Sequence, residues 1–187
     1  MDLIQALEQY HPWNEQESRD CEELLRRLKS GEELYTRDNR SAHLTASAWV
    51  VSPDRTQVLM AYHNLYQSWA WLGGHADGQK DLLAVALKEV REESGLKEVR
   101  PVSHQIYSVE ILTVDGHEKK GEYVSSHLHL NVTYLLEADP SAPVHCKPDE
   151  NSRVGWFRLA DAIAASTEPW FQQRIYAKLN QKLSYFP

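Results

Sequence analysis

The spacing of hydrophobic residues changes near position 42, from a helical period to a strand period. Before this position, apolar residues recur every three or four places, as they do on one face of an α-helix. One such run begins at Leu3 and ends before His11-Pro12, and a second follows Asn14, a residue suited to cap a helix. Two short amphipathic helices cannot form a core alone, so we expect residues 1–41 to be a helical extension packed on the main body or on a partner subunit. The second helix would bury one stripe made of Cys21, Leu24, Leu25 and Leu28.

After position 42 the pattern favours strands. Runs of β-branched or alternating residues are separated by turn-forming residues, and Asp115-Gly116 is typical of a hairpin turn. Polar and apolar residues alternate over 127–136, which predicts a strand with one buried face. The expected strands are 43–51, 58–62, 102–114, 127–136 and 154–157.

Helical spacing returns at three places in this second part of the chain. The middle helix runs from Asp81 to Ser94, with Asp81 as its capping residue and Gly95 at its end. Further helices are expected at 159–165 and 170–183. Because strands lie on both sides of the middle helix, the expected class is α+β, or mixed α/β, with a central sheet.

A glycine-rich loop precedes the middle helix, and that helix carries three acidic residues. Glu89, Glu92 and Glu93 lie three and four positions apart, so their carboxylates share one helical face and repel one another. A hard divalent cation would offset this repulsion, because Mg²⁺ prefers carboxylate oxygens and is commonly shared with substrate phosphates. A glutamate-rich face is also typical of ordinary solvated surface. The spacing alone therefore does not distinguish a metal site from a solvated helix face.

The segment from Gly74 to Leu96 resembles the signature of the Nudix hydrolase family. That signature reads Gly, five residues, Glu, seven residues, Arg-Glu, an aliphatic residue, any residue, Glu-Glu, any residue, Gly, an aliphatic residue. Lys80 departs from the first Glu, and Lys88 departs from the Arg. The matching positions are Gly74, Glu89, Val90, Glu92, Glu93, Gly95 and Leu96.

The resemblance covers about residues 42–165 and implies an α/β/α sandwich around a mixed sheet. We therefore assign 1–41 to the helical extension and 42–187 to a Nudix domain, whose last helix is 170–183. The resemblance also implies an activity, the hydrolysis of a pyrophosphate linked to some other group, often in a nucleoside diphosphate derivative. No motif of the chain identifies the group that is linked to the pyrophosphate.

The resemblance implies roles for particular residues around a bound Mg²⁺, with Mn²⁺ as the alternative ion. Glu92 and Glu93 would be the principal metal ligands, and the Gly74 carbonyl a further one. Glu89 would be a ligand or the base that activates water, and Glu150, in a later loop, is the alternative base. The catalytic candidates are therefore Glu89, Glu92, Glu93 and Glu150.

The two departures from the signature, Lys80 and Lys88, affect residues that would orient the metal ligands more than the ligands themselves. Lys88 keeps a positive charge but loses the planar fork with which Arg braces a carboxylate. Lys80 reverses the charge at its position, and the neighbouring Asp81 would have to leave its capping role to replace it. We expect metal binding to survive, because Glu89, Glu92 and Glu93 are intact.

An anionic substrate needs local positive charge and a surface for its remaining group. Trp71 would stack on a base or ring, and His75 in the glycine loop would contact phosphate, although each also has an ordinary packing or hydrogen-bonding use. His127 and His129 lie on the same side of a strand and suit a transition metal, but no third ligand stands at a telling spacing. The cationic candidates are Lys80, Lys88, Arg91, Arg37, Arg40 and the pair Lys119-Lys120.

Composition narrows the class of partner and the compartment. Acidic residues outnumber basic ones by 27 to 20, for a net charge of −7, so the chain lacks the positive field that a nucleic-acid polymer requires. No apolar stretch approaches the roughly 20 residues that span a bilayer, and the first residues do not resemble a secretory signal. Two cysteines, Cys21 and Cys146, are too few for a disulfide framework. We expect a cytoplasmic protein that acts on a small anionic diphosphate and binds neither nucleic acid nor membrane.

Two other functions compete with hydrolysis. Lys80 and Lys88 would also suit a binding or regulatory module that kept the fold and lost turnover. An isomerase similar to isopentenyl diphosphate isomerase uses a related fold, but it needs a cysteine in the early strands, and none is present there. The helical extension would either cap the pocket or build a homodimer.

Overall fold

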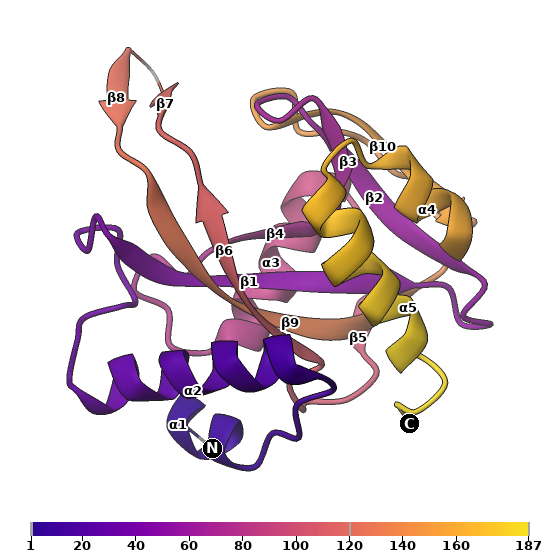
Figure 1. The fold of residues 1–187 in the computed structure, drawn as a ribbon. Helices are drawn as coiled ribbons and strands as arrows, with labels where there is room; N and C mark the ends of the chain where they lie inside the picture. Colours follow the sequence, from indigo (N-terminus) through magenta and orange to yellow (C-terminus); the bar gives the residue numbers. More distant parts are fainter. Residues whose placement is uncertain (1, 120, 187) are drawn as a thin grey trace.

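The computed structural model describes residues 2–119 and 121–186 and contains a curled sheet with helices on both faces (Figure 1). The strands of this sheet are β1 (Ala42–Val51), β2 (Gln57–His63), β3 (Ser68–Ala70), β4 (Leu72–His75), β5 (Val99–Pro101), β6 (Ser108–Val114), β9 (His127–Ala138) and β10 (Asn151–Arg158). Their order is β10-β2-β1-β9-β5, with β3 beside β2, β4 beside β1 and β6 beside β9. The central pair β1 and β9 is parallel, and the flanking pairs are antiparallel. The predicted mixed fold with a central sheet is therefore confirmed.

Every residue of β1 is buried, because packed side chains cover both faces of this strand. Leu44 and Ala46 join the core formed with α3 (Leu82–Ser94), which lies across β1 and β4. Trp49 and Val51 belong to a second core, on the opposite side, shared with the C-terminal helices. The result is the layered arrangement expected when both faces of a sheet must be removed from water.

The C-terminal layer consists of α4 (Leu159–Ala165), η1 (Phe171–Tyr176) and α5 (Ala177–Lys182). The predicted helix at 159–165 is confirmed. The predicted helix at 170–183 is also present, but its first part, η1, has the wider turn of a π-helix. Two successive residues of η1, Ile175 and Tyr176, are buried in the core, where the Tyr176 ring stacks on Trp49 at 5.3 Å between centroids.

The N-terminal extension forms two helices, α1 (Leu3–Glu8) and α2 (Glu15–Lys29), that pack on the body of the same chain. Asn14 begins α2 as predicted, because its side-chain oxygen accepts a hydrogen bond of 3.0 Å from the backbone N–H of Glu17. Cys21 and Leu24 are buried in the first core, and α2 lies along β6 (Figure 1). Leu25 and Leu28 are only partly buried. Of the two arrangements left open by the sequence, packing on the body is the one observed.

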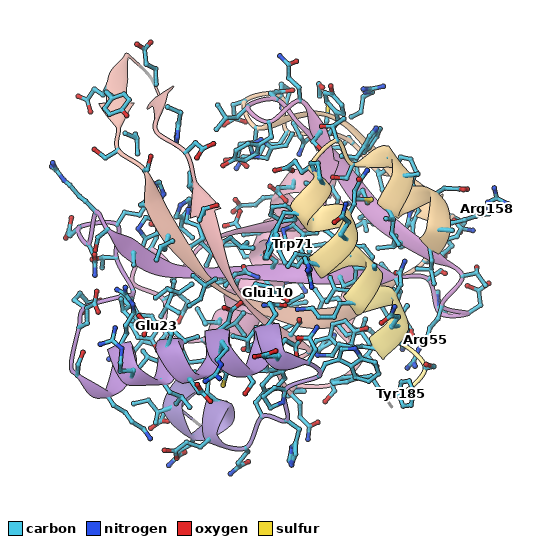
Figure 2. The ribbon with its side chains drawn as sticks, in the orientation of Figure 1. Glu23, Arg55, Trp71, Glu110, Arg158 and Tyr185 are labelled. Carbon is cyan, nitrogen blue, oxygen red and sulfur yellow. The ribbon has the colours of Figure 1, made fainter. Side chains whose placement is uncertain are left out.

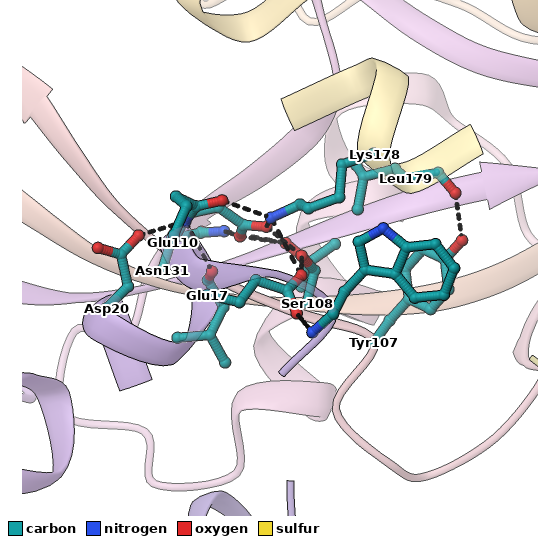
Figure 3. A network of polar contacts seen from close by, with 12 residues as sticks. Glu17, Asp20, Tyr107, Ser108, Glu110, Asn131, Lys178 and Leu179 are labelled. Carbon is teal, nitrogen blue, oxygen red and sulfur yellow. Dashed lines mark hydrogen bonds and ion pairs between the residues drawn. The ribbon is translucent and has the colours of Figure 1, made fainter. Parts of the chain in front are cut away.

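A buried ionic network joins this extension to the sheet and to the C-terminal helix (Figure 3). Lys178 of α5 lies 2.9 Å from Glu110 of β6 and 3.1 Å from Glu17 of α2. Lys182, one turn later, lies 2.9 Å from Glu17, and Ser108 donates to the same carboxylate at 2.6 Å. The carboxylates are fully buried, so each charge is neutralised by a partner from a different layer of the fold.

The burial of β9 differs from the prediction. Alternating polarity over 127–136 predicts one buried face, yet most residues on both faces of β9 are buried. Asn131 and Thr133 are 1% and 0% exposed and donate to the same oxygen of Glu110, at 3.1 and 2.9 Å. Because these hydrogen bonds satisfy the polar side chains internally, that face does not need water.

The hairpin between β6 and β9 also differs from the prediction. The strand begins at Ser108 rather than at residue 102, and the chain does not reverse at Asp115-Gly116. It continues as a second ribbon made of β7 (His117–Lys119) and β8 (Glu122–Val124). Gly121, whose φ of +83° favours glycine, lies between these strands.

Candidate functional site

The middle helix, α3, is held in place by the residues predicted to begin and end it. The Asp81 carboxylate accepts a hydrogen bond of 3.1 Å from the backbone N–H of Ala84, and Gly95 ends the helix in the left-handed conformation at φ +71°. On the side facing β4, the helix carries Glu89 next to Gly74. A Cβ on Gly74 would lie 2.6 Å from the Glu89 carboxyl carbon, so a larger residue here would displace the Glu89 side chain from its present position.

Three carboxylates converge where α3, β4 and the loop before β10 meet. One oxygen from each of Glu89, Glu93 and Glu150 lies within 4.8 Å of the others, a spacing suited to a shared metal ion. Glu93 is buried and accepts a hydrogen bond of 3.1 Å from the backbone N–H of Gly73. Two of these residues belong to the predicted helical set, and Glu150 comes from the later loop considered as a source of the base. Carboxylate oxygens are the donors that Mg²⁺ prefers, so the residues present fit that ion.

The electrostatics of this group favour bound positive charge. Burial raises the pKa of Glu93 to about 8, with the nearby Glu89 and Glu150 adding to the rise. Burial also raises the pKa of Glu89, against the opposing effect of Lys88, whose Nζ lies 3.2 Å from its carboxylate. A carboxylate that is costly to ionise in the empty protein becomes a strong ligand once a cation supplies the missing charge.

Glu92 occupies a different position from its two predicted companions. Its side chain is 42% exposed and lies 3.7 Å from Lys88 and 3.6 Å from Lys147. Successive residues on a helix point about 100° apart, so Glu92 faces the cavity rim while Glu93 faces β4. Its role as a principal metal ligand stays a prediction.

Lys147 is a functional candidate that the sequence analysis did not identify. Its ammonium lies 3.0 Å from Glu150 as well as near Glu92, and it lines the same cavity. Only an isolated lysine in a loop marks it in the sequence, and no spacing connects that loop with α3. The link is tertiary: Asn151, at the start of β10, donates to the backbone oxygen of Glu93 at 3.1 Å.

A wide cavity of about 900 Å³ opens over the carboxylates. This volume is within the range of small-molecule sites. Of the predicted substrate-binding residues, Trp71, His75 and Lys88 line it; Arg91 does not. Arg37 and Arg40 also line it, whereas Lys80 does not, and the side chains of Lys119-Lys120 lie outside the described part of the structure.

Trp71 forms part of the wall between this cavity and the C-terminal helices (Figure 2). Its ring meets Phe171 and Tyr176 edge to face, with centroids 6.0 and 5.8 Å apart. One part of the residue therefore packs inside the protein while another reaches the cavity, so packing and stacking on a substrate ring are compatible uses.

Histidines form a second cluster in the same cavity. One ring nitrogen from each of His43, His75 and His129 lies within 4.8 Å of the others, and Nε2 of His127 lies 3.2 Å from Nε2 of His129. The sequence indicated His127 and His129 but not the missing partners. His43 and His75 are supplied by strands β1 and β4, which lie far away along the chain.

The fold and this site together define a class of protein: a mixed α/β protein with a carboxylate group of metal-binding type at the base of a wide cavity. Comparison with known families then identifies which one. The family model of the NUDIX domain matches residues 41–179, so the chain belongs to the NUDIX family. It is a Nudix hydrolase, an enzyme acting on acid anhydrides. The resemblance drawn from residues 74–96 is thereby confirmed, and α1 and α2 lie outside the matched region.

Solved structures share this fold at low sequence identity. The dihydroneopterin triphosphate pyrophosphohydrolase of E. coli matches with a TM-score of 0.55 at 14% identity, over 78% of this chain and 97% of its own. RenU, a Nudix hydrolase from M. smegmatis, gives 0.54 at 13% identity, over 79% and 88%. The Ap4A hydrolase of C. elegans in a binary complex gives 0.50 at 18% identity, over 76% and 96%. At these identities the likeness shows the fold alone.

Among curated protein sequences, none is similar enough to this chain to count as a relative. Within the described residues, each helix is too short or too polar to cross a bilayer.

Proposed function

We propose that this enzyme cleaves a pyrophosphate bond in a small nucleoside-diphosphate-linked substrate, with Mg²⁺ as its metal and Mn²⁺ as a substitute. The observation that carries this proposal is the group formed by Glu89, Glu93 and Glu150 at the base of a cavity of about 900 Å³. Its donors are all carboxylate oxygens, which suit a hard divalent ion. When bound, that ion would neutralise phosphoryl charge and make water more acidic.

The residues of the chain would divide the remaining work. Glu93, which accepts a hydrogen bond from the N–H of Gly73, and Glu89 would hold the metal. Glu92 is exposed at the cavity rim, where it would become a ligand of a metal ion that is shared with the substrate. Glu89 or Glu150 would accept the proton of the attacking water, and Lys88 supports Glu89 through their 3.2 Å contact.

The cavity has separate surfaces for the two parts of such a substrate. Lys147 and the arginines of the wall supply positive charge for a diphosphate, while Trp71 and Phe171 supply an apolar surface for the linked group. Two proteins of the same fold are named for hydrolysis of Ap4A and of dihydroneopterin triphosphate, which supports a nucleotide-like substrate.

We place this reaction in the cytoplasm and expect no nucleic-acid polymer or membrane among its partners. The acidic net charge and the two free cysteines support this setting. An isomerase-like reaction is less well supported, because neither Cys21 nor Cys146 lines the cavity. A homodimer stays a prediction.

The test is product release from a panel of nucleotide sugars, dinucleotides and nucleoside triphosphates, with and without Mg²⁺. We expect at least one substrate to yield a monophosphate product or pyrophosphate only when the metal is present. Glu93→Gln is the inactive comparison, and Glu98→Gln, an exposed glutamate beyond α3, is the matched control. Tight binding of a panel member without any product would contradict the proposal and favour the binding-module alternative.

A further inference from the structure

The histidine cluster is assembled by the pairing of three strands. In the parallel ladder of β1 and β9, His43 lies directly opposite His129. On the other side of β1, His75 of β4 lies opposite Thr45, two positions after His43 and therefore on the same face. The three rings form a compact triangle, with centroids 5.1 Å apart for His43–His75, 5.1 Å for His43–His129 and 4.9 Å for His75–His129.

One ring nitrogen of His43, a member of this triangle, is buried and unused. The residue is 5% exposed, and its Nδ1 lies 3.1 Å from the backbone oxygen of Asn39. A carbonyl oxygen only accepts hydrogen bonds, so Nδ1 carries the proton and Nε2 carries the lone pair. Nε2 is buried and has no hydrogen-bond partner among the described residues. A histidine whose outer nitrogen donates to a backbone carbonyl is oriented as metal-binding histidines usually are.

A fourth histidine is oriented by the same means. Nδ1 of His127 lies 2.8 Å from the backbone oxygen of Ser125, so its Nε2 carries the lone pair. That Nε2 is 3.2 Å from Nε2 of His129. Zinc–nitrogen bonds of 2.0–2.1 Å in a tetrahedron separate neighbouring nitrogens by about 3.3 Å. The pair therefore already has the spacing of two ligands on one zinc ion.

We propose that His43, His75 and His129 form a second metal site, selective for an imidazole-binding transition ion such as Zn²⁺, with His127 as its fourth ligand. The donor chemistry separates this site from the carboxylate group. Imidazole nitrogens suit zinc and its neighbours, whereas Mg²⁺ prefers oxygen. His75 follows Gly74 directly, so the second ion would lie beside the carboxylate site in the same cavity and add positive charge where an anionic substrate binds.

The test measures metal binding and is independent of turnover. Protein stripped by a chelator is dialysed against Zn²⁺ in the presence of excess Mg²⁺, and bound zinc is counted by elemental analysis. We expect one zinc per chain, and with Co²⁺ as the probe we expect the intense visible absorption of a tetrahedral nitrogen site. The double variant His75→Asn/His129→Asn should lose both signals, and His127→Asn should weaken binding by about 10–100-fold.

Two controls separate this site from other sources of binding. Glu93→Gln removes a carboxylate ligand but no imidazole, so it should keep the full zinc signal. His104→Asn changes an exposed histidine outside the cluster and should also keep it. Thermal melting of each metal-free variant establishes whether it is folded. If the double variant is not folded, the single variant His75→Asn, at a partly exposed residue, replaces it in the test. Zinc that persists without the histidines, zinc that disappears in Glu93→Gln, or no bound zinc at all would overturn the proposal.

Discussion

Two groups of acidic side chains lie inside this fold, and their partners differ. In the ionic network, Lys178 lies between Glu17 and Glu110 (Figure 3), and the ammonium group of Lys182 also pairs with Glu17. In the carboxylate group of Glu89, Glu93 and Glu150, three acids meet. Among the described residues, the lysines that pair with this group are Lys88 and Lys147, which approach from the more exposed side.

The pKa values of Glu17 and Glu93, one from each group, move in opposite directions. Burial acts to raise the pKa of Glu17, but Lys178 and Lys182 lower it to about 2, so this carboxylate stays ionised. Burial raises the pKa of Glu93 to about 8, and its acidic neighbours reinforce the rise. The comparison teaches that burial alone does not assign a role to a carboxylate. Glu17 has two cationic partners inside the fold, whereas Glu93 has acidic neighbours, which makes Glu93 the candidate for function.

The largest effect should come from Glu93→Gln, which removes one ligand charge while keeping the shape of the side chain. We expect kcat to fall by about 10⁴-fold, since the contribution of a metal to phosphoryl transfer is several kcal/mol. The free energy of unfolding without metal should not fall at neutral pH, because the raised pKa of Glu93 makes this buried carboxyl costly to the folded state and Gln removes that cost. Steady-state kinetics and urea unfolding measure the two quantities. If Glu93→Gln were active but unstable, Glu93 would have a structural role like that of the ionic network, and the proposed contrast would be wrong.

Lys178→Met should produce the opposite result, a stability loss without a direct effect on chemistry. Removing one partner of a buried ion pair costs about 3–5 kcal/mol, because Glu110 would lose the ammonium group that lies 2.9 Å from it and Glu17 would keep only Lys182. The matched control is Lys29→Met, whose exposed pair with Glu8 should contribute less than about 0.5 kcal/mol. Equal effects of the two substitutions in urea unfolding would show that the buried network is not structural.

The depressed pKa of Glu17 predicts how stability depends on pH. A carboxyl whose pKa falls from 4.5 unfolded to about 2 folded stabilises the protein above pH 4.5 and loses that contribution as the pH drops toward 2. The loss should be on the order of 3 kcal/mol. In Glu17→Gln, the free energy of unfolding is lower at neutral pH and varies less over this acid range. Identical acid profiles for the two proteins would contradict the assignment.

The smallest effect is expected at Lys88, which supports Glu89 from the side. Lys88→Met should lower kcat by about tenfold, the lower end of the range for residues that orient a metal ligand. Lys88→Arg should keep or raise activity, because guanidinium can brace a carboxylate through two hydrogen bonds. Unchanged kinetics in Lys88→Met would limit the role of this residue to surface charge.

The sequence alone determined the parts of this protein that depend on neighbours along the chain. Helix geometry places Glu89 and Glu93 within one turn whatever surrounds them, and Asp81 and Gly95 set the ends of that helix through their own side chain and backbone. The spacing from Gly74 to Leu96 was enough to predict the family and the mixed fold.

Only the tertiary structure decided which distant residues complete the carboxylate group and the histidine cluster. Glu150 and Lys147 reach α3 because the loop before β10 is held against it, and His43 meets His129 because β1 and β9 pair in one particular register. The burial of Asn131 could not be predicted from the sequence either. Its polarity suggested a solvent-exposed position, and its hydrogen-bond partner Glu110 lies on another strand. Local spacing follows from covalent geometry, whereas strand register and loop placement follow from packing of the whole chain, which no short motif records.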